Sequence, residues 1–176
     1  MGTENEWWHS SETGERFTHC VRCRLPLLEL DSMWLVNREF QAGECMLEYA
    51  VCQGCRDAVT GRMSEESRQA VRAFLEEKID WEARLADFMM AVEPAERLDF
   101  CVSCRAAREK LDGFAISAQF DEGGEMVVGA LPLLICRACV DRMMEGLSEQ
   151  SRAVWRDFVR EHFDGPPDGA SFPGIC

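Results

Sequence analysis

The residues of this chain best suited to chemistry are its cysteines, eight of which stand in Cys-x-x-Cys pairs. The first two pairs are separated by residues 24–51, and the last two by residues 105–135. Two such pairs supply four thiolates, which is the tetrahedral ligand set of a structural zinc ion. The sequence therefore predicts two Zn²⁺ sites and no catalytic residues. The predicted metal ligands are Cys20, Cys23, Cys52 and Cys55 in the first site and Cys101, Cys104, Cys136 and Cys139 in the second.

Iron and thiol redox chemistry are the alternatives to zinc. Rubredoxins also hold their metal with two Cys-x-x-Cys pairs and are acidic, so the chain resembles them in that respect and an iron electron carrier stays open. Rubredoxin pairs are typically followed by glycine, whereas the residues that follow the pairs here are Arg24, Arg56, Arg105 and Val140. A thioredoxin-type redox motif would need a lone exposed pair beside a βαβ pattern, and none is evident.

Charge and hydropathy restrict the partners. The 176-residue chain has a formal net charge of −13, and each zinc ion bound by four thiolates adds about two further negative charges. Such a protein is repelled by a phosphate backbone, which disfavours nucleic acid. No secretory signal is visible at the N-terminus and no apolar run approaches the length of a membrane span. We therefore expect a cytoplasmic protein that does not bind membranes, in which paired cysteines hold metal rather than form disulfides.

The two halves of the sequence repeat each other beyond the cysteines. The segments Met63-Ser-Glu-Glu-Ser-Arg and Leu147-Ser-Glu-Gln-Ser-Arg stand at equivalent distances after Cys55 and Cys139, which indicates a tandem duplication. Ser64 and Ser148 are predicted helix N-caps, and acidic residues follow them where the helix dipole favours negative charge. Apolar residues at helical spacing follow both caps, and the first helix is expected to extend through Trp81, Leu85, Phe88 and Met89 towards Pro94.

Between the cysteine pairs, each half is predicted to form a β-hairpin. The first comprises residues 33–40 and 45–51, and the second comprises residues 113–120 and 125–131, each around a glycine-containing turn. Trp34 and Phe40 match Phe114 and Phe120 as core positions on one strand face. Because each apolar helix face needs cover, we expect the two copies to pack face to face as a pseudo-twofold pair. A homodimer through the helices is the alternative, so the chain is predicted to be a monomer or a homodimer.

The order Cys-x-x-Cys turn, hairpin, Cys-x-x-Cys helix resembles treble-clef zinc fingers, over about residues 20–60 and 101–145. The resemblance implies a zinc knuckle and a helix start that each supply two ligands. Glycine often follows the second cysteine of such a knuckle, whereas Arg24 and Arg105 stand there in this chain. The predicted fold is α+β: two duplicated small zinc-bound modules, each knuckle–β-hairpin–helix with a long capped C-terminal helix. The predicted divisions are an N-terminal segment (1–15), zinc module 1 (16–81), a helical connector (82–97), zinc module 2 (98–164) and a flexible tail (165–176).

Four residues fall outside this pattern. Trp7 and Trp8 stand in a polar N-terminal segment and are expected either to anchor a partner or to fold back on module 1. Cys45 is expected to be a small buried apolar residue. Cys176 ends a tail rich in glycine and proline and is expected to be inert.

The function predicted from these features is a non-enzymatic zinc protein that acts as a protein–protein interaction or adaptor module. Seven arginines crowd the cysteines and are expected to offset the negative charge of the zinc–tetrathiolate centres; they are Arg22, Arg24, Arg56, Arg105, Arg108, Arg137 and Arg142. The alternative is a nucleic-acid or transcription-associated zinc finger. It requires one basic patch, formed by Arg22, Arg24, Arg56, Arg62, Arg68 and Arg72.

Overall fold

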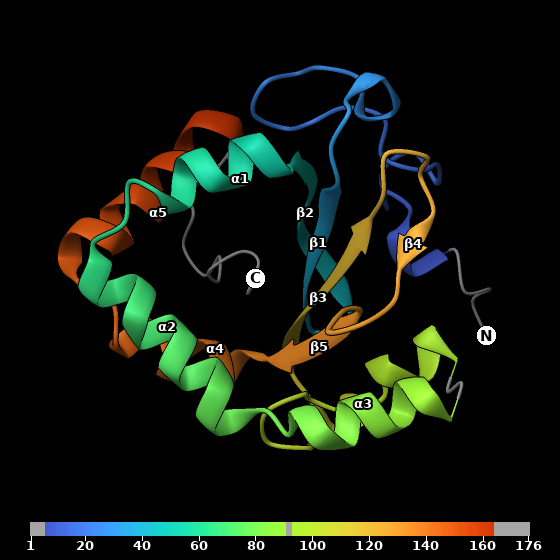
Figure 1. Ribbon diagram of the computed structural model, residues 1–176, viewed down its shortest axis with the longest axis vertical. Helices are drawn as coiled ribbons and strands as arrows, with labels where there is room; N and C mark the ends of the chain where they lie inside the picture. Colours follow the sequence, from blue (N-terminus) through green and yellow to red (C-terminus); the bar gives the residue numbers. More distant parts are fainter. Residues whose placement is uncertain (1–5, 91–92, 164–176) are drawn as a thin grey trace.

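The two predicted hairpins join edge to edge in one antiparallel sheet (Figure 1). The computed structural model describes residues 6–90 and 93–163. Strand β1 (Trp34–Gln41) pairs with β2 (Glu44–Cys52) in the first hairpin and with β3 (Gly113–Phe120) of the second. The described residues thus form an α+β fold with five strands and five helices. The expectation that the copies pack face to face is wrong for the hairpins, because they share one sheet.

The return strand of the second hairpin differs from its prediction. Within the expected strand 125–131, only β4 (Met126–Val127) belongs to the sheet, and it pairs with the end of β3. The chain returns to the sheet as β5 (Leu133–Cys136), which pairs with the first half of β3. Pro132 lies directly before β5 and has no N–H to donate to a ladder, so continuous pairing is interrupted there.

The β1–β3 pair brings together positions that the sequence repeat makes equivalent. Asn37 and Ser117 stand opposite each other at the middle of the pair, and the Ser117 hydroxyl donates to Asn37 Oδ1 at 2.6 Å. The register then runs symmetrically away from this point in both directions. Two ring stacks flank it, formed by Trp34 with Phe120 at 6.0 Å between centroids and by Phe40 with Phe114 at 5.1 Å.

Four helices cover one side of the sheet, and they pack across the two halves of the chain (Figure 1). Helix α1 (Gln53–Thr60) contacts α5 (Glu149–His162), and α2 (Glu65–Lys78) contacts α4 (Arg137–Glu145). Each short helix that follows a cysteine pair therefore packs against the long helix of the other half. These contacts supply the cover that the apolar helix faces need. The module boundaries themselves stay a prediction.

The predicted N-caps of the long helices are confirmed. The Ser64 hydroxyl accepts a hydrogen bond from the Ser67 N–H at 3.2 Å, and the Ser148 hydroxyl accepts one from the Ser151 N–H at 3.2 Å. Each hydroxyl satisfies a first-turn N–H that has no partner within the helix.

The first long helix is shorter than expected. Helix α2 ends at Lys78, Ile79 has an extended backbone, and a separate helix α3 (Trp81–Met89) begins after it. Asp80 Oδ1 accepts from the Ala83 N–H at 2.9 Å and so caps α3. Short 3-10 turns complete the described elements, at Glu6–Trp8, Leu27–Glu29, Pro94–Leu98 and Arg108–Lys110.

Two buried arginines of the predicted connector (82–97) donate hydrogen bonds to the segment that interrupts the second hairpin. Arg84 of α3 donates to the carbonyl oxygens of Ala130 at 2.5 Å and Pro132 at 2.7 Å. Arg97 donates to the carbonyl oxygen of Gly129 at 2.6 Å. Carbonyls that leave the sheet ladder thereby gain charge-assisted partners. Across the described ranges, no helix is both long and apolar enough to cross a lipid bilayer.

The N-terminal segment folds back on the sheet. Trp8 is 5% exposed, and the Trp7 ring packs edge-on against Phe40 at 6.0 Å. The Arg108 guanidinium lies over the Trp7 ring at 4.7 Å from its centroid, in cation–π geometry. Of the two roles expected for these tryptophans, the structure supports packing within the chain rather than anchoring a partner.

Candidate metal centres

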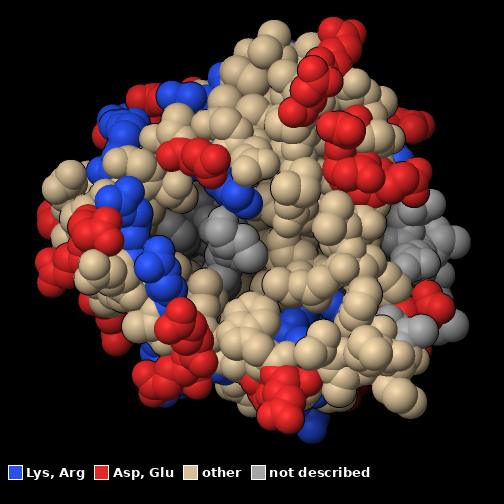
Figure 2. All heavy atoms as spheres, viewed as in Figure 1, with Lys and Arg blue, Asp and Glu red and all other residues tan. Residues whose placement is uncertain are grey.

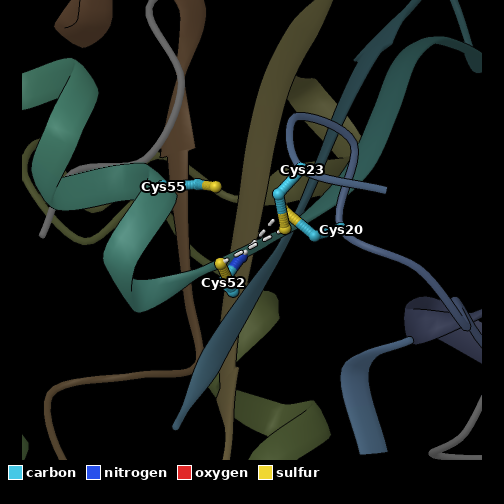
Figure 3. A group of neighbouring side chains, drawn as sticks. All are labelled: Cys20, Cys23, Cys52 and Cys55. Carbon is cyan, nitrogen blue, oxygen red and sulfur yellow. Dashed lines mark hydrogen bonds between the residues drawn. The ribbon is translucent and has the colours of Figure 1, made fainter. Parts of the chain in front are cut away.

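The first predicted site gathers its four cysteines from three elements (Figure 3). Cys20 and Cys23 lie on a tight turn before β1, Cys52 is the last residue of β2, and Cys55 lies in the first turn of α1. Cys52 also occupies the N-cap position of α1, so the strand leads straight into the helix. Figure 3 shows the four sulfurs directed towards a common centre.

The second predicted site repeats this arrangement. Cys101 and Cys104 lie on a turn, Cys136 ends β5 at the N-cap position of α4, and Cys139 lies in the first turn of α4. Although the strand before Cys136 is interrupted, its last four residues still deliver the cysteine to the position that Cys52 holds in the first site.

The spacing of the sulfurs suits one metal ion per site. Within each group the four Sγ atoms all lie within 4.8 Å of one another. The Cys23–Cys52 sulfurs are 4.0 Å apart and the Cys104–Cys136 sulfurs are 3.7 Å apart. A zinc–sulfur bond of about 2.3 Å in a tetrahedron places sulfurs about 3.8 Å apart, whereas a disulfide needs about 2.05 Å. All nine described cysteines are free thiols. The two groups could therefore each hold a metal ion.

The first Cys-x-x-Cys turn of each site explains how arginine takes the place of the glycine expected after it. The Arg24 N–H donates to the Cys20 carbonyl oxygen at 3.0 Å, and the Arg105 N–H donates to that of Cys101 at 3.0 Å. Both arginines have positive φ, 64° and 63°, which is the left-handed region that glycine occupies most easily. The turn is thus built in the glycine conformation with a residue that carries a Cβ.

Backbone N–H groups point at the sulfurs of the buried cysteines. The Cys52 N–H donates to Cys20 Sγ at 3.4 Å, and the Cys136 N–H donates to Cys101 Sγ at 3.3 Å. Burial raises the pKa of Cys20, but N–H groups including those of Cys52 and Cys23 outweigh it and lower that pKa to about 7. Burial raises the pKa of Cys52 to about 12 and also raises that of Cys136. A full set of four thiolates therefore requires a cation at the centre of each group.

Two of the seven arginines expected near the cysteines donate to thiol sulfurs. Arg142 Nη2 lies 2.9 Å from Cys139 Sγ, and Arg22 Nη1 lies 3.8 Å from Cys55 Sγ. Charge compensation is therefore direct at the second site and weaker at the first. Among the other five, Arg108 pairs with Asp99 at 3.3 Å, and the Arg105 guanidinium lies over the Phe100 ring at 5.4 Å from its centroid.

Three of the six arginines of the proposed basic patch make contacts within the chain. Arg56 pairs with Asp57 at 3.5 Å and Arg68 pairs with Glu65 at 2.5 Å, while Arg22 turns towards Cys55. Basic and acidic side chains alternate over the α2 side of the molecule in Figure 2. On the face drawn in Figure 2, the basic side chains on the α2 side therefore have acidic neighbours, which weakens the positive potential that a phosphate backbone would meet there.

The sequence did not identify the environment of Cys45. Its thiol is half-buried and donates to Glu48 Oε2 at 3.3 Å, so it is hydrogen-bonded rather than simply apolar. Burial and the nearby Glu48 carboxylate raise the pKa of Cys45, which keeps it a thiol. Cys176 lies outside the described residues.

Comparison with known proteins finds no relative. No family model matches the chain, and neither curated proteins nor solved structures give a match. The geometry of the two cysteine groups is therefore the main guide to function.

Proposed function

We propose that this chain is a non-enzymatic cytoplasmic protein with two structural Zn²⁺ sites, built from a duplicated treble-clef-like module, that serves as a protein–protein interaction or adaptor module. The observation that carries the proposal is the closure of two four-sulfur groups, each within 4.8 Å. Four protein ligands fill a tetrahedral zinc ion and leave no position for a substrate. The metal is thus suited to hold the fold rather than to react.

Four features of the chain support the duplication and the adaptor role. The equivalent positions Asn37 and Ser117 face each other, and the same backbone turn supplies the first two cysteines of each group. The net charge of −13 favours basic protein surfaces over phosphate backbones. Large apolar side chains are also exposed on the described surface, mostly away from the cysteines.

Metal analysis and affinity capture test the two parts of this proposal. The purified protein is expected to be colourless with two zinc ions per chain, and Cys52→Ser is expected to retain one. A red protein containing iron would favour the rubredoxin-like alternative. Capture from the native cell is expected to recover a defined protein partner at physiological salt. Recovery of nucleic acid alone, lost steeply as salt rises, would favour the transcription-associated alternative.

A further inference from the structure

Helix α3 presents an apolar surface that the rest of the described chain leaves uncovered. Among the residues that the structure describes, eleven large apolar side chains are exposed, and five of them lie between residues 81 and 90. Three of these five are more than 60% exposed: Leu85 at 61%, Met89 at 73% and Met90 at 79%. Such a concentration in so short a segment is typical of an interaction site rather than of scattered surface residues.

This surface forms one wall of a groove. Trp81, Leu85 and Phe88 face the segment 128–130, where the chain has left the sheet, and together they enclose a volume of about 300 Å³. The groove keeps its shape because Arg84, on the same helix, binds the carbonyl oxygens of Ala130 and Pro132. The interruption of the second hairpin, which has no counterpart in the first, therefore creates the groove.

The charged side chains on and next to α3 in the sequence are mostly acidic. Residues 79–98 contain five acidic side chains and two basic ones. Both basic residues, Arg84 and Arg97, are over 90% buried and donate to backbone carbonyls. Figure 2 shows mostly uncharged atoms over this part of the surface, with acidic groups and a few basic ones among and beside them. The acidic residues are Asp80, Glu82, Asp87, Glu93 and Glu96.

From these observations we infer that the α3 groove binds a cationic amphipathic helix of another protein, with apolar side chains against Leu85 and Phe88 and basic side chains beside Glu82, which flanks the apolar face of the helix. A helix laid in an apolar groove is a common recognition mode, and the acidic rim selects basic partners. A second copy of this chain is a poor occupant, because it would bring another −13 charge and the same acidic rim to the contact. The inference rests on the proposed adaptor role: it assigns the α3 groove as the surface that contacts the partner and a basic helix as the class of partner.

A peptide titration with matched variants tests the inference. The probe is a synthetic helical leucine–lysine peptide in a heptad pattern, labelled for fluorescence anisotropy, and its leucine–glutamate counterpart is the control peptide. Full-length, metal-loaded protein is compared with the double variant Leu85→Gln/Phe88→Gln. The control variant Leu28→Gln/Met46→Gln changes two side chains that are 69% and 64% exposed elsewhere on the surface.

We expect the lysine peptide to bind wild type and the control variant equally, and the α3 variant about tenfold or more weakly, since central apolar contacts dominate such interfaces. The glutamate peptide is expected to bind none of them. Equal binding of the lysine peptide to the α3 variant, or no binding at all, would overturn the inference. So would sedimentation showing a dimer that Leu85→Gln/Phe88→Gln dissociates, because the occupant would then be a second copy. A cellular partner captured equally by the α3 variant would overturn this surface yet leave the adaptor role standing, whereas the absence of any partner would overturn the adaptor role.

Discussion

Ser64 and Ser148, the N-caps of the two long helices, have hydroxyl oxygens 3.0 Å apart. The backbone N–H of each cap residue also donates to a serine hydroxyl of the other helix. The Ser64 N–H donates to Ser151 Oγ at 3.0 Å, and the Ser148 N–H donates to Ser67 Oγ at 2.8 Å. The N-termini of α2 and α5 are therefore fastened to each other by equivalent serines. This contact joins the two halves of the chain far from the sheet.

Removal of either crossing hydroxyl is expected to destabilise the fold. Ser67 and Ser151 are both fully buried, so Ser67→Ala or Ser151→Ala leaves a backbone N–H without its partner and costs about 1–2 kcal/mol. Urea unfolding measures the loss, and the half-buried Ser32→Ala serves as control. Equal stability of the serine variants and wild type would show that the contact contributes nothing.

Glycine at position 24 or 105 is expected to stabilise the protein. Both arginines hold positive φ, which costs a residue with a Cβ about 1 kcal/mol relative to glycine. Arg24→Gly and Arg105→Gly should therefore raise the free energy of unfolding by about that amount. Arg24→Ala is the control, because alanine keeps the Cβ and should give no such gain. A gain from alanine equal to that from glycine would mean that backbone conformation is not the cause.

The arginine at the second site is expected to strengthen metal binding there. Arg142 donates to Cys139 Sγ at 2.9 Å, whereas Arg22 is 3.8 Å from Cys55 Sγ. Loss of such an outer hydrogen bond typically weakens metal affinity by about 10-fold to 100-fold. Arg142→Gln should therefore lower the affinity of one site in competition with a chromophoric chelator, and Arg22→Gln should have a smaller effect. The reverse order would contradict the assignment.

Glu48 is expected to contribute stability that acid removes. Burial raises the pKa of Glu48, but hydrogen bonds from Ser10 and Ser11 outweigh it and lower that pKa to about 2. Because the folded pKa lies below the unfolded value, the contribution is complete above about pH 4.5 and is lost as pH falls towards 2. Wild type should exceed Glu48→Gln by roughly 2 kcal/mol at pH 7, and the difference should shrink below pH 4.5. Metal loss in acid affects both proteins and cancels in the comparison. A difference that is constant with pH would exclude this role.

The local features of the fold could be predicted from the sequence because their causes are local. The first hairpin follows from aromatic and β-branched residues around a glycine-containing turn. The caps follow from Ser64 and Ser148, because a serine hydroxyl can accept a hydrogen bond from a first-turn N–H. The convergence of the cysteines follows from their spacing. The same signals predicted the second hairpin only in part, since Pro132 interrupts its return strand.

The long-range relationships could not be predicted in this way. Nothing in the repeat says whether equivalent strands meet edge to edge or face to face, and both arrangements bury the same aromatic residues. The β1–β3 pairing at Asn37 and Ser117, and the crossing of α1 to α5, depend on contacts distant in sequence. The break at Ile79 was missed because the apolar spacing continues through it, although Asp80 carries the chemistry of an N-cap.

Zinc K-edge X-ray absorption on the purified protein, with its metal content measured in parallel, tests the central claim most directly. The account predicts two zinc ions per chain, each with four sulfur neighbours at about 2.3 Å. A shell containing oxygen or nitrogen ligands, fewer than two ions per chain, or cysteines recovered as disulfides would contradict it.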